Sequence, residues 1–394
     1  MKALRYLSAS YLLPVTGAPI REGVIAVDGE GVIRGIFRLD ELAADQLHKI
    51  ERYNGIIIPG FINAHCQLEY SHLLGMIPPK KGLPYFLSKT IETSNTPVSM
   101  LDDAMERADR EMYGNGIVAV GDHVKTDIST KIKKSSSLYY HTFIEMMGGD
   151  SAAEIAFKLK EATLLKAEFS TTPVSITLSS FSSCAKILVK KFTKMLPDND
   201  CLSIRNQESE TENQLFRYRS GELLDFYEKI GRNMDAFRAS ARNALQSNLL
   251  NLPKQKRLML LYNTFTSVKD IYFVQRMGYE VIWCFCPKKS LYREGVLPKI
   301  NTFFESGQMI ALGTGSLASN NKLCLLEELK VIHENFKGLT FGETLKWATI
   351  NGAMALGIED QYGSLEVGKK PGILLLQNMY GMSLKKRTSV SRLI

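Results

Sequence analysis

The sequence has few cysteines, no long apolar run and no strong excess of one sign of charge. Six cysteines in 394 residues, with no C-x-x-C pair, exclude a disulfide scaffold and favour free thiols in a reducing compartment. No stretch reaches the roughly 18 apolar residues that a transmembrane helix needs. Arg5 and Pro14 interrupt the apolar N-terminal segment, so we expect no signal peptide. These absences predict a soluble, cytoplasmic protein.

The charge is close to balanced for a chain of this length. Lys and Arg number 49 and Asp and Glu number 41, which gives a net charge of +8. This mild excess is compatible with an anionic small molecule and gives no reason to expect nucleic acid or a membrane as partner. A hydrophobic fraction of 45% and a charged fraction of 23% exclude a disordered chain or a fibre.

Short apolar runs alternate with helical patterns along the middle of the chain, which is typical of parallel βα units. A helix is predicted to begin at Pro97 and to stop at Gly114, and Thr340 with Glu343 predicts a capping box at another helix start. Eight such units over about 290 residues predict the α/β class and a (β/α)8 TIM-type barrel. The runs are Ile56–Ile62, Ile117–Val120, Tyr140–Met146, Val174–Leu178, Leu202–Arg205, Leu258–Asn263, Val281–Phe285 and Met309–Leu312.

The two ends of the chain contain short β-like runs separated by Gly and Asp turns. Gly23–Asp28 and Val32–Phe37 lie near the N-terminus, and Ile373–Leu376 lies near the C-terminus. Because the termini of a domain are often close in space, we expect these runs to pair in one small β-sandwich. The predicted organisation is therefore a sandwich from residues 1–58 and 360–394, and a barrel from residues 59–359.

The segment that follows the first predicted barrel strand carries a motif. Residues 59–69 read PGFINAHCQLE. Here the chain resembles the amidohydrolase superfamily, in particular its deaminase and chlorohydrolase-like branch, which opens with PGFINAHxHLE. Later segments are similar to the HxxE motif of strand five, the strand-six segment, the CP and GTDS segments of strands seven and eight, and the closing segments of the family. These are Ser203–Glu208, Leu261–Asn263, Cys286-Pro287, Gly313–Ser316, Asn351–Ala353 and Gly368–Gly372.

The resemblance implies one zinc or iron ion bound by the two histidines of HxH, a strand-five histidine and a strand-eight aspartate. This chain retains His65 as the only one of these ligands, and the other three positions hold Gln67, Arg205 and Gly315. Glutamine offers a neutral amide oxygen, arginine has no lone pair to donate and glycine has no side chain. We therefore expect no metal cofactor, whereas the family uses zinc or iron.

Two further family positions concern proton transfer. The resemblance makes Glu208 the vestigial proton shuttle of strand five, and it places Tyr262 where the family has a strand-six histidine. Without a metal, a water molecule keeps a pKa near 15.7 rather than about 7, so the family's hydrolysis would have no nucleophile. We interpret the chain as a catalytically inactive homologue that binds a small molecule or a partner protein.

An active enzyme is the alternative interpretation. It would be a hydrolase or deaminase that acts on a non-peptide C–N bond of a purine-like or related amine, through relocated ligands or without metal. Such ligands would have to converge to about 2 Å from one point. The candidates are His65, Cys66, His72, His123, Glu145 and Glu208.

The basic replacement at strand five points to an anionic ligand. We expect Arg205 to take the place of the metal's charge and to pair with Glu208, because an unpaired buried carboxylate would be costly. Lysines after strands one and seven would surround the mouth of the site with positive charge. These are Lys80, Lys81, Lys288 and Lys289.

The loop after strand one supplies the other expected binding residues. Glu69 and His72 follow the family pattern of this loop, and Tyr85-Phe86-Leu87 is expected to form an apolar wall. The predicted binding set consists of His65, Gln67, Glu69, His72 and Lys288. The expected partners are a small anionic ligand, and a second copy of this chain or an active paralogue.

Overall fold

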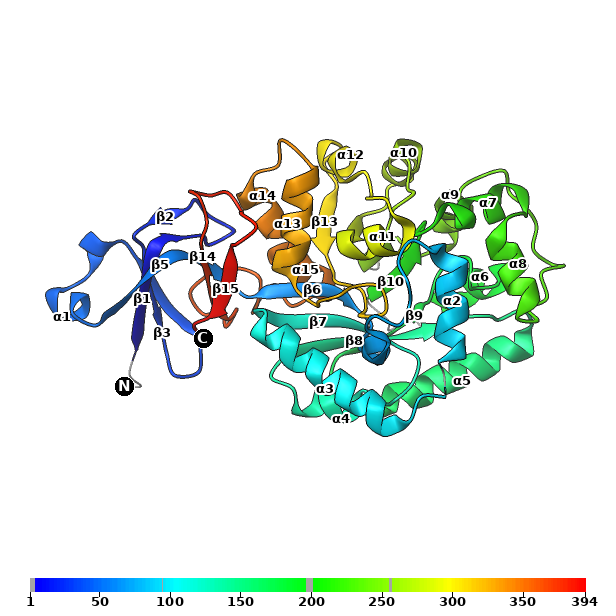
Figure 1. Ribbon diagram of the computed structural model, residues 1–394, viewed down its shortest axis with the longest axis horizontal. Helices are drawn as coiled ribbons and strands as arrows, with labels where there is room; N and C mark the ends of the chain where they lie inside the picture. Colours follow the sequence, from blue (N-terminus) through cyan, green and yellow to red (C-terminus); the bar gives the residue numbers. More distant parts are fainter. Residues whose placement is uncertain (1–3, 94, 196–200, 255–256) are drawn as a thin grey trace.

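The computed structural model describes residues 4–93, 95–195, 201–254 and 257–394, and it has a smaller lobe built from both termini beside a larger α/β lobe (Figure 1). Eight parallel strands of the larger lobe form two sheets, in the orders β6-β7-β8-β9 and β10-β11-β12-β13. Their bounds are β6 Phe61–Cys66, β7 Ile117–Val124, β8 Tyr139–Met146, β9 Val174–Leu178, β10 Cys201–Asn206, β11 Arg257–Tyr262, β12 Val281–Phe285 and β13 Met309–Leu312.

The two parallel sheets meet at both of their edges. Ser180, which follows β9, forms a bridge with Arg205 in β10, and Cys66 at the end of β6 forms a bridge with Gly315 after β13. The Thr314 and Gly315 N–H groups also donate to the His65 carbonyl, at 3.0 and 3.1 Å. The eight strands therefore follow one another around a ring, which is the arrangement that the predicted eight-stranded barrel requires.

One predicted barrel strand is wrong in its extent. The run over residues 56–62 is divided between β5 (Ile50–Pro59), which belongs to the terminal sheet, and β6, which begins at Phe61. A Cβ at Gly60 would lie 2.6 Å from the Pro371 carbonyl oxygen. Because only glycine fits this close approach of two backbones, the chain can pass from one lobe to the other at Gly60.

Both termini contribute to one seven-stranded sheet, with the order β15-β14-β5-β1-β3-β4 and β2 beside β1. β14 pairs with β5 in the antiparallel direction, which places Leu375 opposite Ile57. Each face of the sheet carries its own apolar cluster, because neighbours such as Tyr6 and Leu7 point to opposite sides. A two-layered sandwich is therefore not confirmed. The strands are β1 Arg5–Leu12, β2 Ile20–Arg21, β3 Val24–Val27, β4 Ile33–Phe37, β14 Ile373–Gln377 and β15 Ser389–Arg392.

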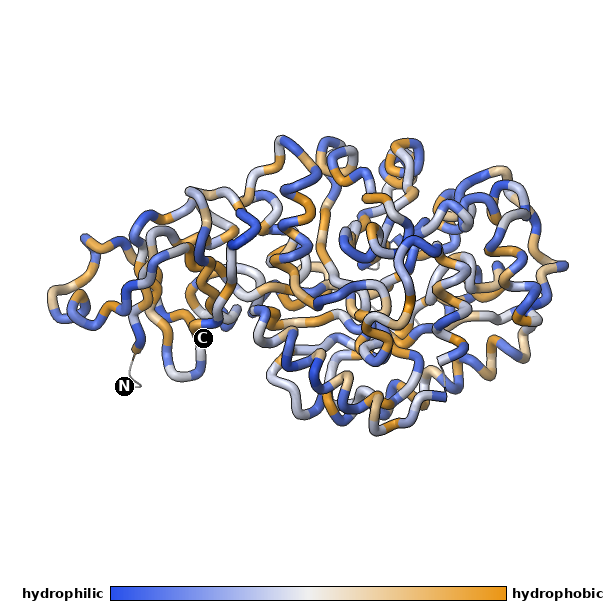
Figure 2. The backbone as a smooth tube through the Cα atoms, in the orientation of Figure 1, coloured by the Kyte–Doolittle hydropathy of each residue, from blue (hydrophilic) through white to orange (hydrophobic). Residues whose placement is uncertain are grey.

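Helices surround the parallel strands, and apolar residues concentrate along the strands in the interior (Figures 1 and 2). The capping box at Thr340 is confirmed, since its hydroxyl accepts the Glu343 N–H, whereas Pro97 is the N-cap of α3 rather than its first helical residue. None of the helices in the described ranges is long and apolar enough to cross a membrane. The helices are α1 Ala44–Leu47, α2 Gly82–Glu92, α3 Val98–Gly114, α4 Thr130–Ser135, α5 Ala152–Glu168, α6 Lys186–Met195, α7 Glu210–Tyr218, α8 Glu222–Lys229, α9 Ala244–Asn248, α10 Val268–Arg276, α11 Pro287–Glu294, α12 Ile300–Glu305, α13 Leu325–Asn335, α14 Phe341–Trp347 and α15 Ile350–Leu356.

Candidate functional site

A cavity of about 160 Å³ lies at the carboxyl ends of the parallel strands, where barrel enzymes place their chemistry. Its polar lining comes mainly from strand ends, the loops after them and α11, and much of its apolar lining comes from α2 and α8. The polar lining includes Gln67, Lys125, Ser179, Ser180, Ser182, Ser183, Arg205, Glu208, Lys289 and Arg293. The apolar and aromatic lining includes Tyr70, Leu83, Phe86, Leu87, Ile91, Met147, Phe226, Tyr227 and Ile230.

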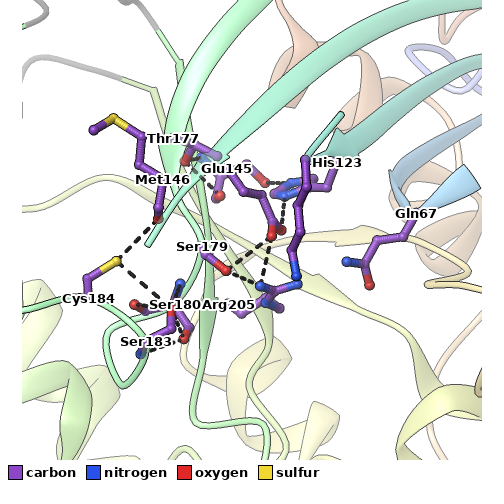
Figure 3. A network of polar contacts seen from close by, with 12 residues as sticks. Gln67, His123, Glu145, Met146, Thr177, Ser179, Ser180, Ser183, Cys184 and Arg205 are labelled. Carbon is purple, nitrogen blue, oxygen red and sulfur yellow. Dashed lines mark hydrogen bonds and ion pairs between the residues drawn. The ribbon is translucent and has the colours of Figure 1, made fainter. Parts of the chain in front are cut away.

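Arg205 pairs with a different carboxylate from the one predicted. Its Nη2 donates to Oε2 of Glu145 at 2.9 Å and contacts the hydroxyl of Ser179, which itself donates to Glu145 at 3.1 Å (Figure 3). The predicted Arg205–Glu208 pair is wrong because Glu145 at the end of β8 lies within reach of the guanidinium, while Glu208 has other partners. Burial alone would raise the pKa of Glu145, but Arg205 and His123 hold it well below its usual range.

The guanidinium of Arg205 keeps donors available to the cavity. Its side chain is 12% exposed, whereas the Glu145 side chain is fully buried. All the hydrogen bonds that it makes to described residues start from Nη2. A guanidinium has five N–H donors in a fixed fork, so Nε and Nη1, which bond no described residue, remain as donors for a ligand.

Glu208 is held by two cations from α11. Its Oε2 accepts from Arg293 Nη1 at 2.6 Å and from Lys289 Nζ at 3.0 Å. Lys289 and Arg293 are four residues apart, so they lie on the same face of the helix. The expectation that Lys289 lies at the mouth is therefore wrong, since it is only 3% exposed. Lys288 points away from the cavity and donates to Asn321 at 2.6 Å.

Gly315 makes room for Lys289. Its φ is +64°, and a Cβ built there would lie 3.2 Å from Cδ of Lys289. The lysine therefore passes over Gly315, and its Nζ lies above the ring of Tyr262. Burial, together with the neighbouring Arg293, lowers the pKa of Lys289 to about 7.

His65 and His123 lie behind the cavity and bind other protein groups. His65 Nε2 is 2.6 Å from the Tyr262 hydroxyl, and its ring meets the His123 ring edge-on with centroids 4.6 Å apart. His123 Nδ1 is 3.0 Å from Glu145, and its Nε2 is 2.8 Å from the Ser203 hydroxyl. Burial lowers the pKa of both imidazoles, most strongly that of His65. Both rings are therefore neutral at pH 7.

These side chains do not fit the zinc or iron ion of the predicted family. A catalytic zinc ion needs about three protein ligands and one open position. His65 Nδ1 has no hydrogen-bond partner among the described residues, but both nitrogens of His123 are occupied, and Arg205 and Lys289 bring positive charge. No group of three or more His, Cys, Asp or Glu in the described ranges is placed to hold a metal. Of the relocated candidates, Glu145 pairs with Arg205, and Glu208 pairs with Lys289 and Arg293.

Glu69 and His72 are not among the lining residues of the cavity, but Glu69 holds a loop whose residue Lys125 lines it. The Glu69 carboxylate accepts the N–H groups of Lys125 and Thr126, and so it fixes the loop after β7. Burial raises the pKa of Glu69 to about 7. His72 Nδ1 bonds to the carbonyl of Glu69 at 3.0 Å. In the expected apolar wall, Phe86 and Leu87 line the cavity, and Tyr85 is not among its lining residues.

Sequence reasoning missed Arg293 and the aromatic residues of α8. The spacing of Lys289 and Arg293 in a helix after strand seven is a usable signal, because both side chains must then face the same way. Phe226 and Tyr227 carry no such signal, since an amphipathic helix places aromatic residues in many cores. Their contribution to the cavity depends on how α8 packs.

Most of this chain is similar to known proteins. Residues 56–390 match the model of the Amidohydrolase family. An adenosine deaminase of Helicobacter pylori is 22% identical over 328 residues, which cover 80% of this chain and 78% of that protein. A 5-methylthioadenosine/S-adenosylhomocysteine deaminase of Teredinibacter turnerae is 33% identical over 123 residues, 29% of this chain and 27% of its own length.

Solved structures also resemble this chain. The crystal structure of Helicobacter pylori aminofutalosine deaminase in complex with methylthio-coformycin superimposes with a TM-score of 0.81 at 19% identity, over 94% of this chain and 92% of that one. An adenosine deaminase of Xanthomonas campestris with bound zinc gives 0.71 at 18% identity, over 94% and 84%. At these identities the likeness establishes a shared fold.

Proposed function

The chain belongs to the amidohydrolase family, and from the side chains that fill its site we propose that it has lost metal-dependent hydrolysis and binds a small organic anion instead. The observation that carries this proposal is Arg205, a buried guanidinium at a ligand position of the family. Only its Nη2 is engaged by described residues, and the group lines the cavity. A carboxylate or phosphate is the natural partner of such a fork of donors.

The shape of the cavity supports a ligand with an apolar body. Phe86 from α2 and Phe226 from α8 line the same cavity as Arg205. Burial of an apolar group against these rings would add to the charge-assisted hydrogen bonds that Arg205 donates. The proposed ligand is therefore an organic acid rather than a bare inorganic ion.

The size of the cavity argues against the purine-like alternative. A volume of about 160 Å³ is below the roughly 300–1,000 Å³ that is usual for drug-sized ligands. The names of the relatives describe nucleoside deaminases, whereas this cavity suits a molecule much smaller than a nucleoside. No observation on the described residues favours deamination here.

Calorimetry with matched ligands tests the proposal. Phenylacetate should bind, whereas phenylacetamide, which has nearly the same shape and no charge, should bind at least about tenfold more weakly. Arg205→Gln should weaken phenylacetate binding by a similar factor, and Arg110→Gln on the exposed face of α3 should leave it unchanged. Equal binding of the acid and the amide would contradict the proposal.

Metal analysis separates the proposed function from hydrolysis. We expect purified, untagged protein to contain zinc, iron, manganese and nickel far below one equivalent after dialysis, because the donor set lacks a third ligand. Inductively coupled plasma mass spectrometry measures this directly. One tightly held equivalent would contradict the loss of the metal centre and would favour the deaminase interpretation.

A further inference from the structure

Lys289 is placed unlike an ordinary ion-pairing lysine. It lines the cavity, yet its side chain is 3% exposed, and its Nζ lies between the Glu208 carboxylate and the ring of Tyr262. Gly315 leaves the space through which the side chain reaches this position. The amine is thus fixed at the wall of a small, partly apolar chamber.

Glu208 has a second counter-ion besides Lys289. Arg293 donates to its Oε2 at 2.6 Å and to its backbone carbonyl, and it also pairs through Nε with Glu294 at 2.8 Å. An arginine does not release its proton, so Lys289 is the member of the trio that can become neutral. The other charged or titratable groups of this cluster are Glu294, which pairs with Arg293, Glu212, which accepts the Glu208 N–H, and Arg205, Tyr262, Cys286 and His65.

A buried lysine beside a second cation is the usual setting of a nucleophilic amine. Burial and Arg293 lower the pKa of Lys289 to about 7, so a substantial fraction is neutral at physiological pH. Arg205 on the same cavity supplies donors for an anionic group. A ligand that carries both a carboxylate and a carbonyl could engage the two side chains at once.

We propose that Lys289 adds to the carbonyl carbon of a small 2-oxo carboxylate and forms a reversible imine in this cavity, an inference that rests on the proposed binding of an organic anion. The neutral Nζ forms the new C–N bond, and one of its two protons passes to the carbonyl oxygen, which becomes a hydroxyl. The second proton then leaves the nitrogen and reaches this hydroxyl as the C–O bond breaks, so that the C=N bond forms and the oxygen leaves as water. The C=N nitrogen takes one proton from solvent, and the iminium charge lies beside Glu208, which holds it as it held the ammonium.

Reductive trapping tests the step. The intact protein is incubated with pyruvate and sodium borohydride, and mass spectrometry follows the covalent adduct. We expect one reduced adduct per chain, located at Lys289 by peptide mapping, and its near-complete loss in Lys289→Arg, which keeps the charge. Lys269→Arg, on the exposed side of α10, should be labelled like the wild type. Circular dichroism confirms that each variant is folded.

The controls separate this inference from the proposed function. Methyl pyruvate has the ketone without the charge, so Arg205→Gln should reduce labelling by pyruvate much more than labelling by methyl pyruvate. If phenylacetate binds in the calorimeter but pyruvate leaves no adduct at Lys289, the imine is wrong and the anion site stands. An adduct confined to Lys125, the other lysine on the cavity, or spread over surface lysines would equally overturn the inference.

Discussion

At the scale of single residues, Gly315 and Lys289 act as a complementary pair. Gly315 has no side chain, and Lys289 covers it with its aliphatic stem. Arg205 is a further cation of the site, and its charge is balanced by Glu145. The positive charge of the site is therefore carried by groups that donate hydrogen bonds.

Substitution of Gly315 by alanine tests this packing. Gly307 has almost the same φ, +68° against +64°, but no atom within 4 Å of a built Cβ. Gly307→Ala should therefore cost about 1 kcal/mol of unfolding free energy from backbone strain alone. Gly315→Ala should cost about 1 kcal/mol more, because the methyl group meets Lys289. Chemical denaturation of both variants measures the difference, and equal losses would show that the lysine moves aside freely.

At the scale of the element, α11 supplies the two cations that pair with Glu208. It begins directly after β12 and turns Lys289 and Arg293 toward Glu208, while Lys288 faces outward. Its position is fixed at the N-terminal end, where the Lys288 N–H donates to the buried Glu328 at 2.8 Å. One helix face thus supplies both cations that pair with Glu208.

The pH dependence of stability reports on this helix face. The folded pKa of Lys289 is about 7 against an ordinary 10.5, so between these values the unfolded chain binds the extra proton. The lysine's contribution to stability is therefore smallest below pH 7 and rises with pH up to about 10.5. The difference in unfolding free energy between wild type and Lys289→Met should move in favour of the wild type over this range, as measured by urea denaturation. The unfolding free energy of Lys269→Met should differ from that of the wild type by the same amount at every pH.

At the scale of the whole molecule, the terminal sheet and the parallel strands are joined by side chains as well as by the chain itself. Arg392 in β15 donates to the carbonyls of Tyr113 and Ile117, at 3.0 and 2.7 Å, and its guanidinium lies 4.0 Å from the Tyr113 ring centroid. These contacts attach the C-terminal strand to the end of α3 and the start of β7. The two lobes therefore support each other at the end of the barrel away from the cavity.

Removal of that contact should loosen the sheet without changing the site. Arg392→Ala should lower the unfolding free energy by about 2 kcal/mol, from the lost cation–π contact and two hydrogen bonds to carbonyls. Arg387→Ala, an exposed neighbour in sequence, should change it by less than about 0.5 kcal/mol. Thermal unfolding gives the stability, and phenylacetate binding should stay the same in both variants. A loss of binding in Arg392→Ala would contradict the separation of the two regions.

The sequence by itself determined the family and the order of the parallel strands. Periodicity and local motifs encode these features, because strand patterns, capping boxes and motif segments involve residues near one another in the chain. The residues Gln67, Arg205 and Gly315, on which the expected absence of a metal rests, are likewise visible without coordinates.

Only the tertiary structure decided which charges meet. Arg205 and Glu145 are separated by 60 residues, and Glu208 and Lys289 by 81, so no local pattern could assign these pairs. The cost of an unpaired buried carboxylate favoured Arg205 as the partner of Glu208, but Arg205 pairs with Glu145 from β8, and Glu208 pairs with Lys289 and Arg293 from α11. Partner choice, burial and the lowered pKa of Lys289 all follow from this packing, because electrostatic energies depend on distance in space and on exclusion of water.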